Sequence, residues 1–148
     1  MLIREEQRNG VPAVLVVDDE QDVREIFARV LGRTGYKVVV AESGDQALLE
    51  AATQRFDLAF IDVAMPGLDG AATLRQLKMI SPHTQVVMIT GFVDGPILDA
   101  GEREDRVAQA MELGARGCLR KPFGAERILR TAEYFAGRPS PAWQETPA

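Results

Sequence analysis

Cysteine and histidine are almost absent from this sequence, with Cys118 and His83 the single residues of each type among 148. One cysteine cannot form an internal disulfide, and one residue of each type cannot build a multi-cysteine or multi-histidine metal centre. A serine–histidine–aspartate triad would have to use His83, which follows Pro82 in an expected turn. These absences leave carboxylates as the main chemically active side chains.

Long apolar runs and a strong excess of charge are also missing. The apolar runs stop at about five to eight residues, whereas a transmembrane helix needs about 20. The first three residues pass straight into a charged stretch, residues 4–6, so no signal-peptide core follows the start. The net charge of −5 argues against a nucleic-acid-binding surface, which requires clustered Lys and Arg. We therefore expect a cytoplasmic protein that binds neither membranes nor nucleic acid directly.

The length and composition are typical of one globular domain. The chain has 46% apolar and 26% charged residues, which is ordinary for a folded domain of this size. Residues 1–10 are polar, and residues 138–148 contain three prolines. We expect a flexible N-terminal extension over 1–10, a domain over 11–137, and a flexible C-terminal tail or linker over 138–148.

Five short apolar runs predict strands that are buried on both faces of a parallel sheet. They cover residues 14–17, 37–41, 58–61, 86–89 and 117–119. Apolar stripes at helical spacing follow each run. The stripes lie within residues 23–31, 47–51, 74–77, 107–111 and 125–132. Because strand and helix alternate five times, we predict a doubly wound α/β fold with five parallel strands and five helices in three layers.

Polar side chains stand where the expected strands end. Asp18 and Asp19 follow the first run, and Asp62 ends the third. Thr90 follows the fourth run, and Lys121 follows the fifth. Ligands of open α/β sheets bind beyond the carboxyl ends of the strands, which all lie at one edge when the strands are parallel. The sequence therefore predicts that carboxylates, a hydroxyl and an ammonium meet at this edge.

Several carboxylates in close contact repel one another, so some stay protonated or a cation neutralises them. Oxygen ligands without histidine or cysteine suit a hard cation, most simply Mg²⁺. A carboxylate beside Mg²⁺ and a lysine suits phosphoryl transfer, in which an aspartate can be the nucleophile. Any one of these acids could instead be solvated or cap a helix. Asp19, for example, could cap the helix expected to begin near Asp22.

At these residues the chain resembles the receiver domain of two-component response regulators. The order and spacing of the matching pieces fit the family from about Val11 to Gly137. The resemblance implies a flavodoxin-like sandwich and a regulatory rather than enzymatic role. The matching pieces are residues 16–20, 62–67, 70, 90–91, 114–115 and 121–123.

The resemblance also implies the metal site. Asp62 would be the phosphoacceptor and would bind Mg²⁺ directly, together with Asp19 and the carbonyl oxygen of Ala64. Asp18 would act largely through water. The phosphoryl group would come from a phosphohistidine on a sensor kinase or a histidine phosphotransfer protein.

Switching is implied at two further residues. Thr90 would hydrogen-bond the new phosphoryl group, and Lys121 would pair with it. Phosphorylation adds about −1.5 to −2 charge and strong acceptor oxygens, so both loops would shift and bias a two-state element. We expect the signal to pass to a partner protein. Whether the chain is a stand-alone receiver or part of a longer regulator stays open, as does dimerisation through the helices that carry Val107 and Ile128.

The sequence departs from the family pattern in two places. Three residues before Lys121 the family usually has Tyr or Phe, whereas this chain has Cys118. A thiol there is a small buried hydrophobe or, less plausibly, a redox sensor. The stretch between Thr90 and Lys121 is longer than in the family, and we place the insertion around residues 94–105. It could be a solvated loop, about two extra helical turns, or a docking element with Ile97 and Leu98 as apolar anchors.

Three other functions compete with a phosphorylated receiver: a scaffold, a hydrolase and a dinucleotide-binding domain. A receiver that works without phosphorylation, as a scaffold or adaptor, is the main alternative, and Cys118 and the insertion favour it slightly. A hydrolase with an aspartyl-phosphate intermediate would need a second acid two positions after Asp62, where Ala64 stands. A dinucleotide-binding domain would need a glycine-rich turn where residues 18–20 are all acidic.

Overall fold

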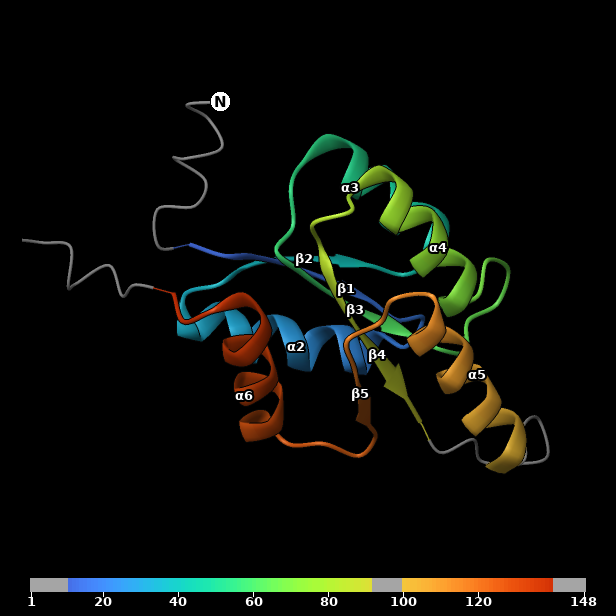
Figure 1. Ribbon diagram of the computed structural model, residues 1–148. Helices are drawn as coiled ribbons and strands as arrows, with labels where there is room; N and C mark the ends of the chain where they lie inside the picture. Colours follow the sequence, from blue (N-terminus) through green and yellow to red (C-terminus); the bar gives the residue numbers. More distant parts are fainter. Residues whose placement is uncertain (1–10, 92–99, 140–148) are drawn as a thin grey trace, which may run out of the picture.

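The computed structural model describes residues 11–91 and 100–139, and within them five parallel strands form one sheet in the order β2-β1-β3-β4-β5 (Figure 1). The strands are β1 (Ala13–Val17), β2 (Lys37–Ala41), β3 (Leu58–Asp62), β4 (Gln85–Thr90) and β5 (Gly117–Arg120). The predicted fold class is confirmed, and each predicted strand lies within an observed one.

Helices cover both faces of the sheet. They are α2 (Gln21–Thr34), α3 (Gly44–Thr53), α4 (Gly70–Ile80), α5 (Ala100–Glu112) and α6 (Ala125–Ala136). Helices α2 and α6 lie on one face, and α3, α4 and α5 lie on the other (Figure 1). In the described part of the chain, no helix combines the length and apolarity of a membrane span.

The core is divided by the sheet into two apolar layers. All residues of β1 and β3 are buried, because these strands have neighbours on both sides and helices on both faces. Leu15 and Ile61 point into the layer under α3, α4 and α5. Val16 and Phe60 point into the layer under α2 and α6. This explains why the strands are continuous apolar runs rather than alternating ones.

Side-chain caps begin two of the helices that follow strands. Ser43 accepts a hydrogen bond from the Gln46 amide at 3.1 Å, and Asp69 accepts one from the Ala72 amide at 2.9 Å. Serine and aspartate are common at this position, because their short side chains can accept a backbone N–H of the first turn. Asp19, considered as a cap for α2, does not cap it: the N-cap position is Glu20, without a side-chain cap hydrogen bond. Asp19 is thus left without a capping role.

Helix α5 begins at Ala100, before Val107, where the apolar stripe of the sequence begins. Its backbone is helical from Ala100, so the later part of the expected insertion is helical, as the alternative of extra helical turns had allowed, and its charged residues belong to the helix. Glu and Arg are strong helix formers, which explains how this run extends the helix without an apolar face of its own. The rest of the insertion, with Ile97 and Leu98, lies outside the described residues.

The chain that follows α6 packs against the turn between α2 and β2. The Tyr36 hydroxyl donates a hydrogen bond to the Gly137 carbonyl at 2.7 Å. Pro139 is buried and lies over Gly35, where a Cβ would be in ordinary van der Waals contact with it at 3.5 Å. The first residues of the expected C-terminal tail therefore make contacts with the turn between α2 and β2. The expected N-terminal extension lies outside the described residues, as do residues 140–148.

Candidate functional site

Three carboxylates meet at the carboxyl edge of the sheet. Asp18 and Asp19 follow β1, and Asp62 is the last residue of the adjacent strand β3. The strands pair in register with Val17 opposite Ile61, so the residues that follow them lie next to each other. One carboxylate oxygen from each acid lies within 4.8 Å of the others. Asp18 and Asp62 are buried, whereas Asp19 is exposed.

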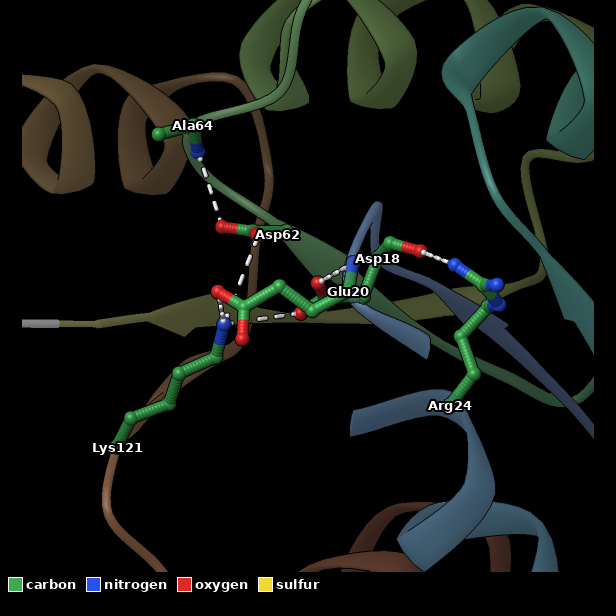
Figure 2. A network of polar contacts seen from close by, with 6 residues as sticks. All are labelled: Asp18, Glu20, Arg24, Asp62, Ala64 and Lys121. Carbon is green, nitrogen blue, oxygen red and sulfur yellow. Dashed lines mark hydrogen bonds and ion pairs between the residues drawn. The ribbon is translucent and has the colours of Figure 1, made fainter. Parts of the chain in front are cut away.

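Backbone amides hold the two buried carboxylates in place. The Glu20 N–H donates to Asp18 Oδ1 at 2.9 Å, and the Ala64 N–H donates to Asp62 Oδ1 at 3.0 Å. Each bond closes a short turn from the acid to the residue two positions later, where the chain leaves the strand. The second oxygen of each acid, Oδ2, is left to face Lys121, as Figure 2 shows.

Lys121 reaches the cluster from the loop that follows β5. Its Nζ lies 3.2 Å from Asp18 Oδ2, 3.2 Å from Glu20 Oε1 and 3.8 Å from Asp62 Oδ2 (Figure 2). Its backbone N–H donates to the Thr90 carbonyl at 2.7 Å, which ties the end of β5 to the end of β4. The Lys121–Pro122 peptide bond is cis.

The electrostatics of the cluster are unbalanced. Burial, reinforced by the nearby Asp18 carboxylate and opposed by Lys121, raises the pKa of Asp62 to about 8. Burial also raises the pKa of Asp18, although the Glu20 N–H and Lys121 both favour its charged form. Burial alone would lower the pKa of Lys121, but Asp62 and Asp18 outweigh it and raise that pKa above its usual value. One lysine therefore does not neutralise these acids, and a further cation would stabilise their charged forms.

The residues present fit a hard divalent cation. Asp18 Oδ2 is buried and, apart from its ion pair with Lys121, receives no well-directed hydrogen bond from any described residue. The cluster of Asp18, Asp19 and Asp62 offers a metal ion carboxylate oxygens as its side-chain ligand atoms. This donor set suits Mg²⁺ or Ca²⁺ rather than zinc or copper.

Thr90 and Gly91 lie at the same edge. Asp62 pairs with Ile89 across the sheet, so half-buried Thr90 comes one position beyond the proposed phosphoacceptor. A Cβ on Gly91 would lie 3.0 Å from Lys121 Cδ, so this glycine leaves room for the stem of the lysine. The structure thus brings Asp18, Asp19, Asp62 and Lys121 close together. It places the backbone of Thr90 and Ala64 beside them at the same edge.

Two contributors had not been identified from the sequence. Arg24, in the first turn of α2, donates from Nη1 to the Asp18 carbonyl at 2.9 Å (Figure 2). Glu20 was read only as part of the acidic run, yet it forms an ion pair with Lys121. Neither role follows from spacing alone, because Arg24 reaches from a helix to the preceding loop and Glu20 meets a lysine from a distant loop.

Cys118 lies on the edge strand β5, opposite Met88 of β4. It is half-buried, and this burial raises the pKa of its thiol despite the opposing charge of Arg120. A raised pKa keeps the group as a thiol rather than a reactive thiolate. The structure therefore favours the small-hydrophobe interpretation of this residue over the redox sensor.

Comparison with known proteins decides the family. The family model described as "response regulator receiver domain" matches residues 14–133, which is most of the chain. The chain belongs to this family. It is thus a receiver domain of the two-component type, a regulatory module. The matched range ends within α6, close to where the fold described above ends.

Individual relatives support the same assignment for the receiver. This chain is 32% identical over 122 residues to the sporulation initiation phosphotransferase F of Bacillus subtilis. The match covers 82% of this chain and 91% of that protein. The solved receiver domain of NtrX from Brucella abortus has a TM-score of 0.72 and 33% identity, covering 83% and 97% of the two chains.

Some relatives are longer or carry a modified site. The chain spans only 25% and 29% of the length of two transcriptional regulatory proteins that it matches. A response regulator from Burkholderia pseudomallei was solved with a phosphorylated aspartic acid, a calcium ion and citrate. That structure has a TM-score of 0.67 and 29% identity, covering 80% of this chain and 64% of its own.

Proposed function

We propose that this receiver accepts a phosphoryl group on Asp62 from a phosphohistidine of a sensor kinase or histidine phosphotransfer protein. The observation that carries the proposal is the buried Asp62 carboxylate with Lys121 Nζ 3.8 Å from its Oδ2. A carboxylate held at Oδ1 by a backbone N–H and facing a lysine at Oδ2 is oriented for attack on phosphorus, with positive charge beside the transferring group.

In this reaction the bond from phosphorus to the histidine nitrogen breaks as a bond from phosphorus to an Asp62 oxygen forms. The phosphohistidine ring, protonated on its other nitrogen, leaves as neutral imidazole, and the product is an acyl phosphate. Asp19 and Asp62, with the Ala64 carbonyl, would hold Mg²⁺, and Asp18 would act largely through water. The cation would offset the charge of the phosphoryl oxygens. Lys121 would supply the remaining positive charge from the opposite side.

The signal would follow from the new charge at Asp62. Thr90 would hydrogen-bond a phosphoryl oxygen and Lys121 would pair with another, so the loops after β4 and β5 would move toward the site. Such a change in contacts shifts a two-state equilibrium by the difference in affinity for the two states. The shifted surface would be read by an output partner protein in the cytoplasm, and the receiver would act as a switch rather than as an enzyme on other substrates.

The similar proteins support this proposal over a scaffold without phosphorylation. The Burkholderia pseudomallei regulator carries a phosphorylated aspartic acid and a calcium ion. A scaffold has no physical need for buried acids whose ionisation is opposed by burial, as at Asp62. We further propose that the functional unit spans residues 11–137, with short segments on either side that serve as an extension and as a tail or linker.

The test is an intact-mass measurement after incubation with acetyl phosphate and Mg²⁺. We expect one added phosphoryl group on the wild type and none on Asp62→Asn. Full labelling of Asp62→Asn would overturn the site assignment. If neither protein gains mass, beryllium fluoride binding is measured on both, because this phosphoryl mimic does not hydrolyse. Binding to the wild type alone would indicate fast hydrolysis, and binding to neither would favour the scaffold.

A further inference from the structure

The Lys121 ammonium is surrounded by three acids. Its Nζ lies 3.2 Å from Asp18 Oδ2, 3.2 Å from Glu20 Oε1 and 3.8 Å from Asp62 Oδ2 (Figure 2). An ammonium group has three N–H donors and no acceptor. Among the described residues, Nζ donates a directed hydrogen bond to Glu20 Oε1, whereas the two aspartates lie at ion-pair distance.

These three acids are not equivalent partners. Asp18 and Asp62 have side chains that are only 0% and 7% exposed, and each is fixed by a backbone amide. The Glu20 side chain is 61% exposed, and within the described residues its carboxylate contacts only Lys121. Glu20 can therefore leave the lysine and enter water without stranding a buried charge.

We propose that Glu20 is an internal competitor for Lys121, a positioning residue that holds the lysine in the resting state and must release it before Lys121 can bind a phosphoryl group on Asp62. This inference rests on the proposed function. It goes beyond it by assigning to an exposed acid at the mouth of the site a role in setting how readily the receiver switches.

The exposure of the Glu20–Lys121 ion pair explains why Lys121 can be released from Glu20 at a small cost in free energy. A phosphoryl group brings acceptor oxygens and about −1.5 to −2 charge, so it attracts Lys121 more strongly than a single carboxylate does. An ion pair as exposed as Glu20–Lys121 is weak because water competes for both groups. Loss of the competitor should therefore change rates and affinities modestly, by about two- to fivefold.

Two substitutions at position 20 separate competition from simple repulsion. Glu20→Gln keeps the side-chain size and removes the charge. Glu20→Asp keeps the charge but shortens the side chain by one methylene, which withdraws the carboxylate from Lys121. Asp22→Asn is the matched control, since Asp22 is an exposed acid in the first turn of α2. The urea midpoint of each variant detects any change in folding at this N-cap.

The measurements are the initial rate of phosphorylation by acetyl phosphate with Mg²⁺, followed by intact mass, and the affinity for beryllium fluoride. In the reaction the phosphorus–oxygen bond of acetyl phosphate breaks as the bond to Asp62 forms, and acetate leaves. We expect Glu20→Gln and Glu20→Asp both to react about two- to fivefold faster and to bind the mimic more tightly. Asp22→Asn should match the wild type.

The outcomes distinguish this inference from the function on which it rests. Wild-type rates in Glu20→Gln would overturn the competitor role while leaving phosphorylation of Asp62 intact. Acceleration in Glu20→Gln but not in Glu20→Asp would assign the effect to repulsion of the anionic donor and would also overturn it. A wild type that neither labels nor binds beryllium fluoride would overturn the proposed function and this inference together.

Discussion

Gly70 lies directly against the backbone of Asp62. Its N–H donates to the Val63 carbonyl at 3.2 Å. A Cβ on this glycine would overlap the Asp62 carbonyl oxygen and would lie 2.8 Å from Val63 Cα. The start of helix α4 therefore sets where the end of β3 can be, and with it the position of the proposed phosphoacceptor.

The substitution Gly70→Ala should consequently disturb both stability and the site. The atoms that the new methyl group would meet are backbone atoms, which cannot move aside like a flexible side chain. We expect a loss of about 1–3 kcal/mol in the free energy of unfolding, measured with urea, and slower labelling by acetyl phosphate. Gly32→Ala is the control, because nothing lies within 4 Å of a Cβ there. It should stabilise α2 by about 0.5–1 kcal/mol. Wild-type behaviour of Gly70→Ala would contradict this role.

The raised pKa of Asp62 predicts a specific pH dependence of stability in metal-free protein. Between the unfolded pKa of 3.8 and the folded pKa of about 8, the folded state binds a proton that the unfolded state releases. Stability contributed by this residue therefore falls as pH rises through that window. Asp62→Asn removes this loss. Its free energy of unfolding, measured with urea, should exceed that of the wild type only slightly near pH 4 and by at least about 1.4 kcal/mol above pH 8. A constant difference across this range would contradict the assignment.

Magnesium should stabilise the folded receiver through the acids of the cluster. A ligand that binds only the folded state at 100 times its Kd adds about 2.7 kcal/mol to the free energy of unfolding. We expect Mg²⁺ to raise the Tm of the wild type and to raise that of Asp19→Asn much less. Glu112→Gln, at the exposed end of α5, should respond like the wild type. If Mg²⁺ raises the Tm of Asp19→Asn as much as that of the wild type, Asp19 is not part of the metal site.

Arg24 should act by holding the acidic turn rather than by its charge. Its guanidinium donates to the Asp18 carbonyl, not to a carboxylate. Arg24→Met should lower the free energy of unfolding by about 1 kcal/mol and weaken Mg²⁺ binding several-fold, measured by calorimetry. Arg29→Met, on the exposed side of the same helix, should leave both unchanged. Partial rescue of Mg²⁺ affinity by Arg24→Lys would support positioning, whereas equal losses in the Arg24 and Arg29 variants would contradict it.

Much of the fold could be predicted because its signals are local. Short runs rich in valine, such as residues 14–17, favour buried strands, and stripes such as Val23 to Leu31 favour an amphipathic helix. The side-chain caps at Ser43 and Asp69 are equally local, because each accepts a hydrogen bond from the amide three residues later. The sequence left the start of α5 open between a loop and about two extra helical turns, because its first two turns are mostly charged and show no apolar periodicity.

The order of residues along the chain was enough to predict which acids reach the carboxyl edge of the sheet, since a parallel sheet places every strand end on the same side. How the side chains share that edge follows from the packing of the folded molecule. Glu20 on Lys121, Arg24 on the Asp18 carbonyl and Gly70 against Asp62 are contacts between separate loops and helices. These contacts depend on how the elements pack in three dimensions, and composition, periodicity and spacing along the chain carry no information about that packing.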